Sequence, residues 1–404
     1  MGQLLPADGV MDWSRFKNVM AGPVGSSVEG AAGIRLPSYL LFWTLGFVYA
    51  CLMALLLQKI LLPLMPSLHA GHGLLNNDAV VFHDMAAQAA ERIRAHGWSE
   101  WKLFPGAGGN VGILSAIYAL LGPDPIWFIP FTAAAHAAGA TLIYRMGGRI
   151  WPGHAGQLGG LIAGIVFLGF PSALQWYGQN HKDAFAIAGT LLVLDAWLGL
   201  HAVKEQQLSS FVSAILRALC GMALVGVVRP YFTIPVLCSL GASFVVSGVL
   251  DLLNAGRASL HRVLSQVFTI GLVAVVAVVF VRIGTSTGVG DYILGETDQV
   301  HLTTFDQVAA TTTSDRWQWA TSPMLPDGVD NVLRRVSELR AHFVLFGRSV
   351  GAGSEIDGER LPTDALAAVS YFPRAVVVGL FAPFPESWVE RVSPIRLIGA
   401  VETA

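Results

Sequence analysis

Two carboxylates lie in a polar stretch that directly follows the first long apolar run. Asp78 stands in Asn76-Asn77-Asp78, and Asp84 follows it beside His83. A carboxylate in such a position can act as general base and take the proton of an acceptor hydroxyl. The alternative is a solvated loop with one amphipathic helix over 79–94, in which both carboxylates only face water.

Basic residues near the ends of other apolar segments supply the second kind of candidate chemistry. Lys182 and Asp183 stand at the head of one apolar helix, and Arg229 occupies a tight turn between two others. A guanidinium offers a phosphate two parallel hydrogen bonds, so Arg229 is a candidate phosphate ligand. Arg374 and Lys102 are further candidates of this kind. The alternatives are snorkelling of the arginines to lipid headgroups and capping of a helix N-terminus by Asp183.

The composition decides what kind of molecule must position these residues. Hydrophobic residues make up 53% of the 404-residue chain and charged residues only 13%, with a mean hydropathy of +0.57. Soluble domains carry about 25% charged residues, so the sequence predicts an all-α polytopic membrane protein. The net charge of −2 gives no reason to expect a nucleic-acid partner. The cysteines fall in apolar runs and are expected to be core residues.

The sequence contains eight apolar runs long enough to span a hydrocarbon core, which needs about 20 residues. They cover 36–65, 126–146, 156–174, 183–203, 209–228, 231–253, 263–284 and 366–384. The shorter run 111–121 is expected not to cross. Basic residues favour the cytoplasmic side, and this assignment places the turns 145–155 and 254–262 there. The segments 66–110 and 285–365 are then expected to face the periplasm.

Two charges stand inside predicted spans. Asp195 and Arg217 are equally far from the inner ends of consecutive antiparallel spans, roughly 12 Å deep. This spacing predicts an intramembrane ion pair. The alternative is a role in moving protons or substrate. No internal repeat is visible, which makes an inverted-repeat transporter less favoured.

Two sequence motifs occur in an order that resembles a known superfamily. Asp78 follows the first span and precedes an Ala-rich helix that ends in Gly97-Trp98, before a Pro/Gly turn. Farther along, the stretch 171–176 is followed by His181-Lys182-Asp183. This order resembles the GT-C superfamily of membrane glycosyltransferases, which includes protein O-mannosyltransferases and lipid A aminoarabinose transferases. The resemblance covers most of 36–284, although the first loop lacks a paired acidic motif and many members continue with further helices.

The resemblance implies a GT-C-like bundle of about eight transmembrane helices in the bacterial inner membrane, with a periplasmic active site that serves the cell envelope. The superfamily's catalytic loop aspartate maps onto Asp78, with Asp84 and Asp183 as alternatives. The basic candidates, Arg229 first among them, would stabilise the phosphate that leaves a polyprenyl-phosphate sugar donor. The acceptor would be a lipid, a glycan or a protein.

No metal or other cofactor is expected. His69, His72 and His83 could be assembled with Asp78 and Asp84 into a divalent-cation site, but loop histidines at such spacings are more often unliganded. The resemblance points the same way for aminoarabinose and protein-mannose transferases, whereas related oligosaccharyltransferases use a metal.

Other functions compete with the transferase. One is an O-antigen or exopolysaccharide polymerase or ligase, which also uses lipid-linked donors. Another is a flippase or transporter of lipid-linked sugars. A flippase needs a polar path across the whole membrane, whereas mid-membrane charge is limited to Asp195 and Arg217.

The chain is expected to divide into four parts. These are a cytoplasmic N-terminal segment (1–35), a GT-C-like transmembrane module (36–284, outer loop 66–110), a periplasmic region (285–365), and a last span with a C-terminal segment (366–404). Within the periplasmic region, apolar residues at helical spacing predict an amphipathic helix over 329–346, on the membrane surface or on the bundle.

Overall fold

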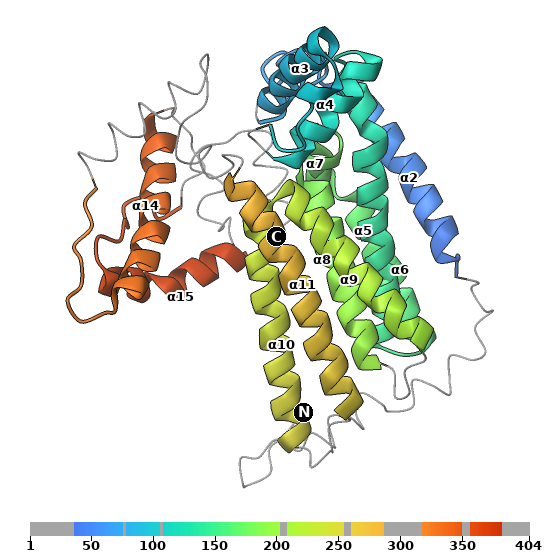
Figure 1. Ribbon diagram of the computed structural model, residues 1–404. Coiled ribbons are helices and arrows are strands. Elements are labelled where there is room, and N and C mark those ends of the chain that lie inside the picture. The colour runs from blue at the N-terminus through green and yellow to red at the C-terminus, as the bar shows by residue number, and fades with distance from the viewer. Residues whose placement is uncertain are drawn as a thin grey trace, which may run out of the picture.

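The computed structural model describes residues 36–75, 78–105, 108–202, 208–253, 260–286, 317–349 and 356–381. Within these ranges the chain forms helices and no β-strand (Figure 1). Six helices are long and apolar enough to cross a membrane. The predicted class, an all-α polytopic membrane protein, is thereby confirmed. The predicted cytoplasmic segment 1–35 lies outside the described residues.

The six spans follow the predicted apolar runs closely. They are α2 (Tyr39–Leu56) continued by η1 (Leu57–Leu61), η3 (Pro125–Phe128) with α5 (Ile129–Ile150), α8 (Asp183–Ala202), α9 (Leu208–Val228), η5 (Pro230–Phe232) with α10 (Thr233–Leu253), and α11 (Leu260–Ser286). Large apolar side chains such as Leu45, Val245 and Val275 are exposed on their flanks. Lipid is the natural solvent for such surfaces, because each helix already pairs its own backbone groups.

The predicted span 156–174 is bent. It consists of α6 (His154–Gly169), η4 (Pro171–Ala173) and α7 (Leu174–Tyr177). The two parts meet at 54°, so they form a broken span or a re-entrant segment. Pro171 has no N–H with which to continue the helix, and it favours the extended conformation that Phe170 adopts.

The described residues contain fewer spans than the total of about eight predicted for the whole chain. The run 366–384 forms α15 (Ala365–Phe381), whose apolar stretch is shorter than a span and contains Pro373. The count is therefore six, or seven if the bent segment crosses. Helix α15 continues through Pro373, whose missing N–H leaves one helical hydrogen bond unmade.

Helices α3 (Asp78–His96) and α4 (Gly109–Leu121) pack on each other at one end of the bundle, hereafter the α3–α4 end (Figure 1). Lys59 at the close of the first span and Asp124 at the start of the next form an ion pair of 3.7 Å. The segment between these residues therefore leaves and re-enters the bundle at the same end. This agrees with the expectation that 111–121 does not cross.

Helices α8 and α9 are in direct backbone contact. A Cβ added to Gly189 would lie 2.7 Å from the carbonyl oxygen of Gly221, and one added to Gly221 would lie 2.5 Å from that of Gly189. Small residues allow this close approach between helices in lipid, where packing rather than the hydrophobic effect holds helices together. A larger side chain at either position would push the pair apart.

The predicted ion pair between Asp195 and Arg217 is present, with Oδ2 and Nε 3.1 Å apart. Two further arginines join it. Arg149 Nη1 lies 3.1 Å and Arg145 Nε 3.5 Å from the other carboxylate oxygen. Asp195 is fully buried, whereas the three guanidinium-bearing side chains are partly exposed. We call these four residues the arginine cluster.

The arginine cluster lies near the end of a third helix as well as inside α8 and α9. Arg149 stands one residue before α5 ends at Ile150, so the cluster lies level with the end of α5 that is opposite the α3–α4 end. Helix α8 continues past this level to Ala202. The prediction considered α8 and α9 alone and did not include α5, which ends beside the cluster.

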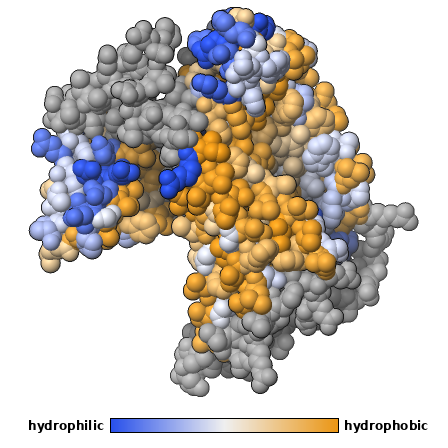
Figure 2. Space-filling model, in the orientation of Figure 1, coloured by the Kyte–Doolittle hydropathy of each residue, from blue (hydrophilic) through white to orange (hydrophobic). Residues whose placement is uncertain are grey.

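A second helical unit follows the spans. The amphipathic helix predicted over 329–346 is present as α14 (Asp327–Ser349), which packs against α15 and buries Ala341 and Leu345 beside Trp317. Figure 2 shows apolar residues over the visible flank of the bundle, with hydrophilic residues gathered on α3 and α14.

Candidate functional site

The linker between α7 and α8 forms the floor of the α3–α4 end. Gln179, which is buried, donates through Nε2 to the carbonyl of Gly73 at 3.2 Å and accepts at Oε1 from the N–H of Leu75 at 2.8 Å. Gln58 donates from α2's extension to the carbonyl of Gly178 at 2.9 Å. These bonds tie the chain that leads into α3 to the start of α8.

Tyr118 of α4 joins three elements below α3. Its hydroxyl lies 2.8 Å from Nδ1 of His83, and Asn180 Nδ2 donates to it at 3.4 Å. Burial, with nearby His72, lowers the pKa of His83, and burial raises the pKa of Tyr118. A neutral His83 that accepts at Nδ1 from the phenol is consistent with both directions.

Asp183 and Arg229 form the strongest polar contact of this end. Asp183 is the first residue of α8, and its Oδ1 accepts from Nη2 of Arg229, which follows the last residue of α9. Arg229 Nη1 also donates to the hydroxyl of Tyr231 at 3.3 Å. The pair connects the ends of the two helices, so the carboxylate has a structural role beyond the predicted N-terminal cap.

Lys182 and His181 complete the group beside this pair. Lys182 Nζ lies 5.4 Å from the centre of the Phe82 ring, which meets the His181 ring edge-on at 6.1 Å. Burial and the positive charge of Arg229 lower the pKa of Lys182, while the carboxylates of Asp183 and Asp78 oppose that shift. Burial also lowers the pKa of His181, against the same two carboxylates.

These interactions place most of the predicted site residues in one electrostatic neighbourhood. It comprises Asp78, His181, Lys182, Asp183 and Arg229, hereafter the polar cluster. Asp78 is the exposed first residue of α3, at the positive end of that helix dipole. The cluster thus combines an exposed carboxylate, a carboxylate paired with a guanidinium, and a half-buried amine.

The remaining predicted site residues lie outside the polar cluster. Asp84 is exposed on α3, where its charge opposes the lowering of the pKa of His83 that burial causes. Lys102 is exposed in the turn before α4. Arg374 binds Asp357 through two hydrogen bonds, Nε to Oδ2 at 2.8 Å and Nη2 to Oδ1 at 3.1 Å. That contact lowers the pKa of Asp357 and occupies the guanidinium edge that a phosphate would need.

Sequence reasoning missed two buried amides near the polar cluster. Asn110, in the first turn of α4, is 1% exposed, and neither of its amide atoms has a hydrogen-bond partner within the described chain. The Oδ1 of Asn180 is likewise unpaired there. Buried polar groups are nearly always satisfied, so amides in this state indicate a place where water or a ligand completes the bonding. Their only sequence signal was a polar residue at the edge of an apolar run.

Glycines bring the start of α4 against the end of α9. A Cβ on Gly109 would lie 2.6 Å from the carbonyl oxygen of Val227, and Gly108 has a φ of +125°, which disfavours other residues. Asn110 and the first turn of α4 therefore lie beside the chain that leads into Arg229. A helix N-terminus favours anions, which adds to the positive character of this place.

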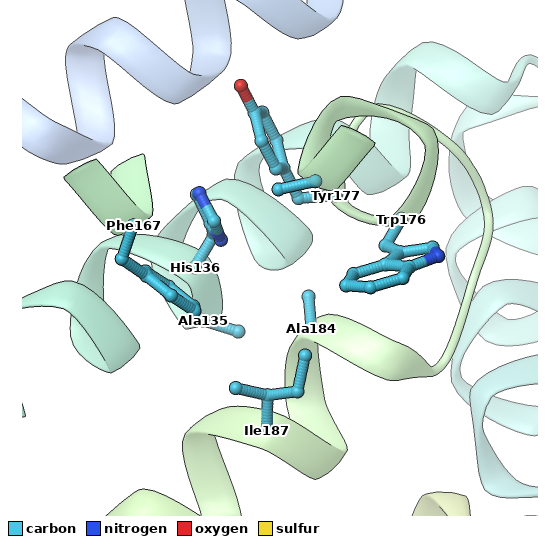
Figure 3. A pocket seen from close by; sticks show the side chains of 8 residues that line it. Ala135, His136, Phe167, Trp176, Tyr177, Ala184 and Ile187 are labelled. Carbon is cyan, nitrogen blue, oxygen red and sulfur yellow. The ribbon is translucent and has the colours of Figure 1, made fainter. Parts of the chain in front are cut away.

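A small cavity of about 20 Å³ lies in the core beneath the linker (Figure 3). His136 stacks between Tyr177 and Phe167 with ring centroids 4.1 and 4.7 Å apart, and Trp176 lies across the space. The volume holds about one water molecule. This cavity is too small to hold a sugar.

No group of three or more His, Cys, Asp or Glu side chains among the described residues could hold a metal ion. His69 Nε2 accepts from the N–H of Gly73 at 3.1 Å, and the rings of His72 and His83 have centroids 5.1 Å apart. The divalent-cation site considered for His69, His72 and His83 with Asp78 and Asp84 is therefore not formed by the described residues.

Comparison with known proteins adds no relative: no family model, no curated protein and no solved structure matches the chain. The resemblance to the GT-C superfamily therefore stays a prediction, carried by the motifs around Asp78 and Lys182. The case for a function rests on the chemistry of the polar cluster and on its position at the end of a membrane bundle.

Proposed function

We propose that the chain is a membrane glycosyltransferase that moves a sugar from a polyprenyl-phosphate donor to an acceptor hydroxyl. The observation that supports this most is the polar cluster at the α3–α4 end. It groups the cations Lys182 and Arg229 with the carboxylates Asp78 and Asp183. A donor of this class presents a phosphate at the membrane surface while its polyprenyl tail stays in lipid.

The proposed reaction is a direct displacement at the anomeric carbon. The acceptor oxygen forms the new bond to that carbon as the bond to the phosphate oxygen breaks. The acceptor proton goes to Asp78, and the electron pair of the broken bond leaves with polyprenyl phosphate. Arg229 and Lys182 stabilise the negative charge on this leaving group.

Asp78 suits the general base better than its alternatives do. Asp183 already accepts from Arg229, and protonating it would weaken a contact that joins α8 to α9. Asp84 lies on the same helix, but its charge influences the pKa of His83 and not that of Lys182. Asp78 combines exposure with proximity to the cations, so it can meet both acceptor and donor.

The proposal places the α3–α4 end in the periplasm and the arginine cluster near the cytoplasm, as the basic residues of the turns predict. In a variant without Cys51, Cys220 and Cys238, an impermeant maleimide should label Trp98→Cys in intact cells. It should label Ile150→Cys only after the membrane is opened. Both native side chains are exposed in the fold. Labelling of position 150 from outside would reverse the orientation.

The function itself can be tested in proteoliposomes that contain the full chain and a panel of polyprenyl-phosphate sugars. Adding an extract of envelope acceptors should release polyprenyl phosphate and attach the sugar to an acceptor. Arg334→Gln should behave like the native chain, since Arg334 is exposed on α14. This variant shows whether losing one positive charge outside the polar cluster changes transfer.

The products distinguish the competing functions. Release of polyprenyl diphosphate from diphosphate-linked glycans, with none from monophosphate donors, would indicate the polymerase or ligase. Movement of an intact donor between leaflets, with no polyprenyl phosphate released, would indicate the flippase. Either result would overturn the proposed transfer from a monophosphate donor.

A further inference from the structure

The arginine cluster carries more positive than negative charge. Three guanidinium groups surround one carboxylate, that of Asp195, and no other carboxylate among the described residues pairs with them. An excess of positive charge in a low-dielectric setting is unfavourable unless an anion balances it.

The cluster stands at the level where lipid headgroups are expected. Arg149 is next to the last residue of α5, and Trp151, which is largely exposed, follows directly. Exposed tryptophan marks the boundary between hydrocarbon and water in membrane proteins. The guanidinium groups thus lie at the depth of phosphates rather than of acyl chains.

A groove opens on the lipid-facing side of the same cluster. It has a volume of about 720 Å³ and runs along α9, beside Leu192 of α8. Its walls are apolar apart from Arg217, Ser209 and Ser213. Ser213 Oγ accepts from Nη1 of Arg217 at 2.6 Å, which holds the guanidinium at the groove. An apolar groove with one cationic end matches the shape and polarity of a phospholipid.

We propose that this groove binds an anionic phospholipid of the bilayer, with its phosphate against Arg217 and its acyl chain along α9. Charge complementarity selects this occupant: the phosphate supplies the anion that the arginine cluster lacks, and the apolar walls accept the chain. A zwitterionic lipid carries its own cation and offers less net charge to the cluster. The site lies at the opposite end from the polar cluster, so it is independent of the proposed transferase activity.

The test uses the full chain in detergent, titrated with phosphatidylglycerol or with phosphatidylcholine, with bound lipid counted by native mass spectrometry. Phosphatidylglycerol should bind at least roughly tenfold more tightly, as expected for hydrogen bonds between charged groups. Arg217→Gln should remove most of this preference. Val212→Trp should also remove it, by filling the groove without changing any charge.

Matched controls separate the site from general effects. Val245→Trp adds the same side chain to the exposed flank of α10, and Arg334→Gln removes an exposed arginine from α14; both should keep the preference. Equal binding of the two lipids by the native chain would overturn the proposal. So would a preference that survives both Arg217→Gln and Val212→Trp. If soluble glycerol phosphate binds as tightly as phosphatidylglycerol, the site is occupied by a free anion and not by a lipid.

Discussion

Asp78→Asn should lower sugar transfer by roughly 10²- to 10⁴-fold, which is the usual contribution of a positioned general base. Asparagine keeps the size of the side chain at the start of α3 but cannot take a proton. Donor binding and thermal stability should stay close to those of the native chain, because Asp78 is exposed at the start of α3. Single-turnover transfer with purified lipid-linked donor measures the chemical step.

Asp84→Asn is the matched control for this result. It removes the same charge from the same helix at another exposed position, and transfer should be nearly unchanged. Near-normal transfer by the Asp78→Asn chain would move the catalytic role to Asp84 or Asp183. Normal transfer by Asp78→Asn, Asp84→Asn and Asp183→Asn chains alike would end the transferase hypothesis.

Arg229→Ala should act differently in the same assay. The donor phosphate is present in the ground state and in the transition state, so donor binding should weaken together with turnover. Lysine at this position should restore only part of the loss, because it keeps the charge without the bidentate geometry. Asp183→Asn tests the ion pair separately: it should lower stability while leaving Arg229 free to bind phosphate.

The second large effect is expected at the arginine cluster. Asp195→Ala should lower the free energy of unfolding by about 3–5 kcal/mol, because it leaves several partly buried guanidinium groups without their carboxylate. Arg217→Ala should cost less, since Asp195 keeps its contacts with Arg145 and Arg149. The double variant should fall between the two single variants. Thermal unfolding and folded yield in detergent report this order.

Asp124→Ala provides the control for loss of a carboxylate. Its pair with Lys59 is about half exposed and contributes less than about 1 kcal/mol. Its carboxylate also caps η3 by accepting from the N–H of Ile126 at 3.0 Å, and loss of a cap costs about 1 kcal/mol. Because Asp195 and Arg217 are in contact, the losses from the single variants should not add. Additive losses would contradict the contact, and a loss for Asp195→Ala as small as that for Asp124→Ala would contradict the buried network.

The sequence predicted the spans well because hydrophobic length is a local property of the chain. It predicted the contact of Asp195 with Arg217 from equal spacing along two helices. Arg145 and Arg149 were interpreted only as markers of the cytoplasmic side, because nothing local shows that α5 ends beside α8. Pro171 carried the signal for the break after α6, but apolar length outweighed it.

The candidate site was only partly predictable. Asp78, Lys182 and Arg229 were identified from charge in places where apolar helices end. The buried amides of Asn110 and Asn180 were missed, because burial depends on packing between elements far apart in the chain. Arg374 looked equivalent to Arg229 until the structure showed its pair with Asp357.

Helices α8 and α9 are joined at three levels: Asp183 with Arg229 at one end, Gly189 against Gly221 along their length, and Asp195 with Arg217 toward the other. Contacts at both ends and along the length oppose separation of the two helices. Under the proposed function, a polyprenyl tail would therefore lie beside this pair rather than between its two helices.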